Sequence, residues 1–200
     1  MSAGLAIKRL VDVAGATALL ILSAPLWLII AILVRLDSPG PALFSQQRIG
    51  LHGRPFTLFK FRTMRQGAEQ EWQPPDASEL DSYIFQDDGD PRITRIGRFL
   101  RRTSLDELPQ LINILKGEMS LVGPRPEVPE IVALYEPRMH RRHAMRPGLT
   151  GLAQVSGRGT LTTGETLVLD LAYCEEWSLR LDLAILGRTF CQVVGQKGAR

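Results

Sequence analysis

A continuous apolar run near the N-terminus, positions 13–34, constrains this chain more than any other feature. The run carries no charge, and at about 1.5 Å of rise per residue a helix of this length reaches across most of the roughly 30 Å hydrocarbon core of a bilayer. It is longer than the apolar region of a cleaved signal peptide, which is about 7–15 residues. The run therefore predicts a membrane anchor.

The flanks and the centre of the run indicate how this anchor passes through the membrane. Lys8 and Arg9 precede it and Arg35 follows it, and basic residues at both ends favour two cytoplasmic ends. Pro25, two residues after Ser23, has no N–H and crowds a preceding carbonyl, so a helix must bend or break there. Two routes stay open: a helix–break–helix that enters and leaves by one face, and a kinked spanning helix.

The remaining chain is long enough for one compact domain with its own core. We expect an anchor at 1–38 and a cytoplasmic domain at 39–200. Segments 42–44 and 56–61 are aromatic or β-branched and flank glycines, which predicts a short β-hairpin. The expected fold class is α/β, mixed and helix-rich, with this hairpin and amphipathic surface helices.

Segment 66–90 differs in character from its surroundings. It contains eight acidic residues, no basic one, and the pair Pro74 and Pro75. Loops of this length in compact domains are usually lids or disordered segments. We therefore predict a mobile loop.

The basic residues indicate what the domain binds. Only four of the 24 are lysine, and the planar fork of arginine suits phosphorylated ligands or an anionic membrane surface. Nucleic acid is not an expected partner, because no recognition motif is present and aromatic residues make up only 6% of the chain. Cys174 and Cys191 have neither metal-binding nor redox spacing, and we expect two buried thiols.

Two adjacent acids, Asp106 and Glu107, precede an amphipathic helix that ends near Gly117. Ser104 with Glu107 matches a capping box, in which Glu107 merely caps the helix; Asp106 as N-cap suits Pro109 better. Either helix start favours ionised acids. Their side chains diverge by about 100°, which suits two roles, one acid attacking and the other binding a metal.

Several arginines lie near this acidic pair in the sequence. Steps of three and four place those between 95 and 102 on one side of a short helix, although a solvated basic face is the competing interpretation. Arg125 and Arg146 lie beside prolines and glycines, which can aim a guanidinium from a stiff turn. Residues 140–143, His-Arg-Arg-His, are expected to form a solvated basic helix face near lipid phosphates.

Taken together, the motifs carry a resemblance. After the anchor with its central proline come, in order, the segments 47–50, 60–64, 90–94, 104–110, 122–126 and 146–151. Over nearly its whole length the chain resembles the bacterial sugar transferases, the small monotopic phosphoglycosyl transferases.

The resemblance implies a reaction and a location. A sugar phosphate would pass from a UDP-sugar to undecaprenyl phosphate with release of UMP, as the first membrane step of surface glycoconjugate or exopolysaccharide assembly. The enzyme would sit on phospholipid at the cytoplasmic face of the bacterial inner membrane, held by a re-entrant anchor that breaks at Ser23 and Pro25. The sequence does not reveal which sugar is transferred, and a homodimer is left open.

The resemblance also implies residue roles. Asp106 would be the nucleophile that forms a phosphoryl-aspartate, Glu107 the Mg²⁺ ligand, and Arg101 a contact to the polyprenyl phosphate. The remaining substrate contacts implied are Lys60, Arg62, Arg102, Arg125, Arg146 and Arg158.

Two other function classes stay open on the residues alone. A Mg²⁺-dependent phosphatase of isoprenoid phosphates would also use acids and arginines, but it would not need a UDP-sugar. A non-catalytic membrane scaffold would use the basic surface without chemistry, and release of UMP from a UDP-sugar would exclude it.

Overall fold

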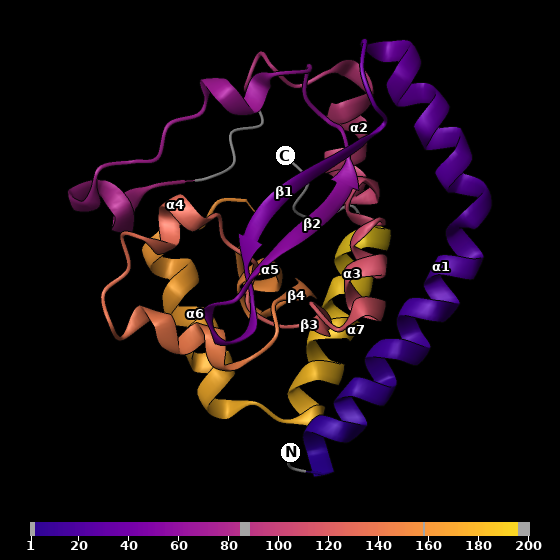
Figure 1. The fold of residues 1–200 in the computed structure, drawn as a ribbon. Helices are drawn as coiled ribbons and strands as arrows, with labels where there is room; N and C mark the ends of the chain where they lie inside the picture. Colours follow the sequence, from indigo (N-terminus) through magenta and orange to yellow (C-terminus); the bar gives the residue numbers. More distant parts are fainter. Residues whose placement is uncertain (1–2, 85–88, 158, 196–200) are drawn as a thin grey trace.

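A long N-terminal helix lies along one side of a mixed, helix-rich domain (Figure 1). The computed structural model describes residues 3–84, 89–157 and 159–195. Helix α1 (Ala3–Asp37) is followed by the strands β1 (Leu43–Ile49), β2 (Pro55–Phe61), β3 (Ser120–Val122) and β4 (Gly148–Thr150). The other helices are α2 (Arg95–Thr103), α3 (Gln110–Lys116), α4 (Pro129–Val132), α5 (Leu152–Gly157), α6 (Thr163–Glu176) and α7 (Leu179–Gly195).

The strands form two small sheets. Strands β1 and β2 pair antiparallel, with Leu43 opposite Phe61 and Ile49 opposite Pro55, so the predicted hairpin and the helix-rich α/β class are confirmed. Strands β3 and β4 pair parallel. This second pair was not predicted, because strands of three residues are too short to show an alternating pattern.

Helix α1 passes through the predicted break without interruption, so the re-entrant break is not confirmed. Figure 1 shows α1 as one curved helix. Close to the proline, the Ser23 hydroxyl donates to the carbonyl of Leu20 at 3.4 Å and accepts from the indole of Trp27 at 3.2 Å. Pro25 therefore lies within a helix that continues on both sides of it.

Both halves of α1 are attached to the same domain. In the N-terminal half, Lys8 forms a 2.7 Å ion pair with Asp182 of α7, and Asp12 accepts a 2.9 Å hydrogen bond from the hydroxyl of Ser120 in β3. In the C-terminal half, Ile30 and Val34 are buried in a cluster with side chains of β2 and α2. The middle of the helix is exposed and apolar. Among the described residues α1 is the one helix long and apolar enough to cross a membrane, which fits membrane association.

The core of the domain lies where α3, β2, β3, α6 and α7 meet, around Leu111, Ile114 and Tyr173. The described part of the acidic segment contains two 3₁₀ turns, η2 (Ala68–Glu71) and η3 (Ala77–Ser82). Leu80 of η3 is buried against the α4 region. Residues 85–88 lie outside the described residues, and the mobility of this loop stays a prediction.

The two cysteines are free thiols. Cys174 is partly buried and Cys191 is exposed. The expectation of two buried thiols is therefore wrong for Cys191, which lies on α7.

Candidate active site

Asn113 fastens α3 to the hairpin. Its side-chain amide donates to the carbonyl of Thr57 at 2.7 Å and accepts from the backbone N–H of Phe59 at 3.1 Å. Asn113 is fully buried, and an amide that is buried with both ends paired specifies one arrangement of the elements it joins. Lys60, the next residue of β2, is thereby held beside the start of α3.

The acidic pair lies in a tight turn between α2 and α3. Helix α2 ends at Ser104, which has a left-handed conformation with φ of 57°, and Asp106 and Glu107 follow in the 3₁₀ turn η4 (Leu105–Glu107). Helix α3 begins after Pro109, which occupies the N-cap position. Both expected helix starts are therefore wrong: Ser104 turns the chain, and neither Ser104 nor Asp106 caps α3.

Helix α2 approaches the end of β2 closely. A Cβ on Gly97 would lie 2.0 Å from the carbonyl oxygen of Thr63, so only glycine permits this approach. One turn later the Arg101 guanidinium donates to the hydroxyl of Thr63 at 3.0 Å. The contact brings Arg101 to the site from α2.

The junction of β3 and β4 delivers another arginine. The backbone N–H of Gly123 donates to Thr150 and that of Gly148 donates to Pro124, each at 2.9 Å. These bonds place Arg125 next to the turn η4, where its guanidinium forms a 3.4 Å ion pair with Glu107.

The elements converge on one polar pocket. It collects five of the predicted site residues, namely Asp106, Glu107, Lys60, Arg101 and Arg125. The other lining residues are Arg48, Leu58, Gln110, Pro126, Gly148 and Leu149. Four cations therefore surround two carboxylates, so the pocket suits an anionic ligand.

Other predicted site residues lie elsewhere. Arg62 holds the chain just after α1, where its guanidinium donates to Ser38 Oγ at 2.6 Å and to the carbonyl of Pro41 at 2.7 Å. Arg102 is exposed on α2, and Arg146 donates to the carbonyl of Gly117 at 2.9 Å. Neither lines the pocket. Arg158 lies outside the described residues.

Two pocket residues with polar side chains had no role in the sequence prediction. Arg48 of β1 is buried and donates to the carbonyl of Pro126 at 3.1 Å. Gln110 is buried at the first position of α3. Both lie in motifs that carry the family resemblance, and this is the sequence signal that could have identified them as site residues.

Burial controls the electrostatics of the pocket. It raises the pKa of Asp106 to about 6, with a further upward contribution from Glu107, while Lys60, Arg101 and Arg125 oppose the rise. Burial also lowers the pKa of Lys60 to about 8, assisted by Arg48. The expectation that a helix terminus keeps Asp106 readily ionised is wrong, because the acid lies in a short turn where desolvation outweighs the nearby cations.

The carboxylates of the pocket are candidate ligands for Mg²⁺. Among the described residues no group of three or more His, Cys, Asp or Glu side chains could hold a metal ion by itself. Mg²⁺ is commonly bound by one or two carboxylates together with substrate phosphates. Glu107, in a pocket whose cations suit an anionic ligand, fits that mode of binding.

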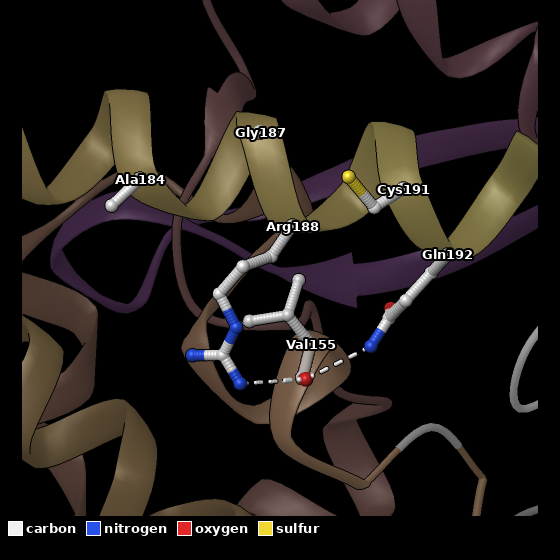
Figure 2. A pocket seen from close by; sticks show the side chains of 6 residues that line it. All are labelled: Val155, Ala184, Gly187, Arg188, Cys191 and Gln192. Atoms are coloured by element: carbon white, nitrogen blue, oxygen red, sulfur yellow. Dashed lines mark hydrogen bonds between the residues drawn. The ribbon is translucent and has the colours of Figure 1, made fainter. Parts of the chain in front are cut away.

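A second hollow lies between α5 and α7 (Figure 2). It measures about 480 Å³ and is lined by Val155, Ala184, Gly187, Arg188, Cys191 and Gln192. Its two long polar side chains, Arg188 and Gln192, both donate to the carbonyl of Val155, at 3.0 and 2.9 Å. Among the described residues that line it there is neither a carboxylate nor a basic cluster, so the polar pocket is the candidate active site.

Comparison with known proteins identifies the family of this chain. The family model for bacterial sugar transferases matches residues 3–196. Similar proteins include the undecaprenyl-phosphate glucose phosphotransferase of Komagataeibacter xylinus (44% identical, covering 96% of this chain and 36% of that protein). They also include the UDP-glucose:undecaprenyl-phosphate glucose-1-phosphate transferase of Caulobacter vibrioides (46%; 91% and 67%).

The chain spans very different fractions of its relatives. It corresponds to about a third of the Komagataeibacter protein, whereas it covers 89% of the uncharacterised sugar transferase EpsL of Bacillus subtilis, which is 41% identical over 96% of this chain. The match to the family model nevertheless extends over almost all of the residues given. The chain belongs to the bacterial sugar transferase family.

Proposed function

We propose that this protein transfers a sugar phosphate from a UDP-sugar to undecaprenyl phosphate and releases UMP. The observation that carries the proposal is a buried carboxylate, Asp106, in a pocket lined by Arg48, Lys60, Arg101 and Arg125. A diphosphate donor brings negative charge that such cations stabilise. The names of the relatives support the acceptor and the general reaction.

The first step is attack by a carboxylate oxygen of Asp106 on the phosphorus that bears the sugar. A bond forms between this oxygen and phosphorus, the bond from phosphorus to the bridging oxygen breaks, and its electron pair leaves on UMP. Lys60 and Arg125 lie where they can neutralise charge that develops on the phosphoryl oxygens and the leaving group.

The second step returns the enzyme to its starting state. An oxygen of undecaprenyl phosphate attacks the phosphoryl-aspartate, the bond from phosphorus to Asp106 breaks, and the carboxylate is restored. Arg101, which reaches the pocket from α2 beside α1, would bind the acceptor phosphate.

Glu107 would hold Mg²⁺ for the donor phosphates, while Asp106 acts as the nucleophile. The ion would add positive charge at the phosphoryl oxygens. Arg125, already paired with Glu107 at 3.4 Å, would share this anionic environment and keep the carboxylate oriented toward the pocket.

Membrane attachment supplies the acceptor. The phosphate of a long isoprenoid lies at headgroup level, so the catalytic acid must be held there too. The two docked ends of α1 favour an arrangement in which both ends stay on the cytoplasmic side with the domain, while the exposed apolar middle enters the bilayer. The acidic loop at 66–90 would order over the bound donor.

The decisive experiment omits the acceptor. The protein is incubated with a panel of UDP-sugars and Mg²⁺, UMP release is measured, and the digested protein is searched by mass spectrometry for a sugar-phosphate adduct. We expect one equivalent of UMP and an adduct on Asp106. Asp106→Asn should abolish both, because an amide of the same shape is not a competent nucleophile.

Glu107→Gln is the matched control. Its loss should be severe but partly relieved by raised Mg²⁺, unlike that of Asp106→Asn. An adduct on Glu107 would refute the assignment of the nucleophile. UMP formed only with acceptor present would refute the two-step route, and phosphate released from an isoprenoid phosphate without any UDP-sugar would favour a phosphatase.

A further inference from the structure

The backbone that carries Arg125 is held from behind by a second, fully buried arginine. Arg142 lies in the 3₁₀ turn η5 (Met139–Ala144), and only 2% of its surface is exposed. One terminal nitrogen, Nη2, donates to the carbonyl oxygen of Arg125 at 2.6 Å. Residue 142 thus reaches from one loop to the backbone of the residue that pairs with Glu107.

The terminal nitrogens of Arg142 make two further contacts. The same Nη2 donates to a carboxylate oxygen of Asp170 on α6, and Nη1 donates to the hydroxyl of Tyr135 at 2.6 Å. Asp170 is completely buried. The expected solvated basic face at 140–143 is therefore wrong for Arg142 and for His143, which is also buried; His140 and Arg141 are exposed.

Stability alone does not explain this buried network. Burial of an ion pair has a large desolvation free energy, and apolar side chains of similar volume often give equal or greater stability. At this location the Arg142 guanidinium binds the carboxylate of Asp170 and the carbonyl of Arg125 at the same time. Because the guanidinium is planar, it fixes the geometry of these two groups relative to each other.

We propose that Arg142, oriented by Asp170, is a positioning residue that sets the location of Arg125 for catalysis. Arg142 does not line the pocket, so it acts through the backbone of Arg125. The proposal rests on the proposed function for its catalytic consequence, because Arg125 is assigned there to the donor phosphates.

Arg142→Lys tests the proposal with charge retained. A lysine can keep an ion pair with Asp170, but its side chain is shorter and lacks the rigid plane that places Nη2 between Asp170 and the carbonyl of Arg125. We expect the rate of UMP release to fall by about tenfold or more, since small misplacements of a catalytic group have effects of this size. The rate of UMP release should also fall in Asp170→Asn, which keeps the arginine but removes the charge that orients it.

Tyr135→Phe is the matched control. It removes the other hydrogen bond of the same guanidinium and leaves the contact with Arg125 in place. Its rate of UMP release should stay within about twofold of wild type, even if its thermal midpoint falls as far as that of Arg142→Lys. All rates are measured below the lowest midpoint, so that each variant is folded.

A double-mutant cycle separates positioning from general stability. If Arg142 acts through Arg125, Arg142→Lys should slow wild type but have little further effect in an Arg125→Ala background. Multiplicative losses in the double variant, or an equal loss in Tyr135→Phe, would overturn the proposal.

A second measurement does not depend on activity. Arg125 is partly exposed, with 31% of its side chain accessible, so its modification by phenylglyoxal can be followed by peptide mass spectrometry with exposed Arg102 as internal reference. Arg142→Lys should change the modification rate of Arg125 relative to Arg102, and Tyr135→Phe should not. An unchanged ratio in Arg142→Lys refutes the positioning role, whereas a wild-type protein that forms no UMP refutes the proposed function and leaves this measurement to decide.

Discussion

Asp106 and Lys60 line one pocket and have pKa values shifted toward each other. Burial raises that of the acid to about 6 and lowers that of the amine to about 8. Each shift disfavours the charged form that the proposed mechanism needs. The site therefore retains charges at a cost in stability and is fully charged only between these two pKa values.

The first prediction at this scale is a bell-shaped pH profile for UMP release in a single turnover. The rate should rise with pH through about 6 as Asp106 becomes ionised, and fall above about 8 as Lys60 loses its proton. Lys60→Arg should keep the cation and move the alkaline limb to higher pH. A limb that stays in place in this variant would show that another group titrates.

The second prediction concerns stability. The pKa of Asp106 is about 6 in the folded protein and about 3.9 in an unfolded chain, so stability falls as pH rises between these values, by about 3 kcal/mol in total. Asp106→Asn should therefore unfold at a higher urea concentration than wild type at about pH 7.5. The difference should shrink toward zero at about pH 3, below both pKa values, where the Asp106 carboxyl is mostly neutral in the folded and the unfolded protein; a pH-independent difference would contradict the prediction.

At the scale of elements, close approaches of backbone place the side chains. Helix α2 lies against the end of β2 because residue 97 has no Cβ. The contact brings Arg101 to Thr63, so a shift of α2 would move Arg101 away from the pocket.

Two helical glycines give a matched pair of substitutions. A Cβ at Gly97 would lie 2.0 Å from the carbonyl of Thr63, whereas one at Gly187 of α7 would meet no atom within 4 Å. Gly97→Ala should lower the free energy of unfolding by about 2 kcal/mol and reduce UMP release. Gly187→Ala should raise it by about 0.5–1 kcal/mol through helix propensity and leave activity unchanged. Chemical denaturation with parallel rate measurements checks both; equal effects would contradict the steric account.

At the scale of the whole molecule, α1 is docked at two separated places. Lys8 and Val34 are about 39 Å apart along a helix with 1.5 Å rise per residue, yet both pack against the same domain. A helix that crossed the membrane from end to end could not keep both contacts. The arrangement therefore favours a membrane-embedded middle with both ends beside the domain.

The prediction at this scale is that residue 3 and α7 lie on the same side of the membrane. Two proteins are compared. In the first, Ala3→Cys is combined with replacement of Cys174 and Cys191 by alanine, so that labelling reports on residue 3. The second is the wild-type protein, in which the exposed Cys191 of α7 reports on the domain. A membrane-impermeant maleimide should label neither protein in intact cells and both after permeabilisation. Labelling of residue 3 alone in intact cells would show that α1 spans.

Features that depend on neighbouring residues were predictable from the sequence. The apolar run, the hairpin with its glycines and the arginine-rich helix each follow from local spacing and composition. The acidic pair, Lys60 and Arg125 lie in motifs that carry the family resemblance, and Arg101 was predicted from that resemblance. The family model matches residues 3–196. Their roles as nucleophile, metal ligand and substrate contacts stay predictions.

Only the tertiary structure decided which side chains of the same type meet. Arg62 and Arg48 both stand in motifs beside the hairpin, yet Arg62 holds the chain after α1 and Arg48 lines the pocket. The sequence predicts that Arg142 lies on the surface, but it is buried, because it pairs with Asp170 of α6, which lies 28 residues later in the chain. By itself the sequence determined the elements and the chemistry available, since these depend on local spacing; long-range packing determined burial, partners and pKa, since these depend on contacts between distant segments.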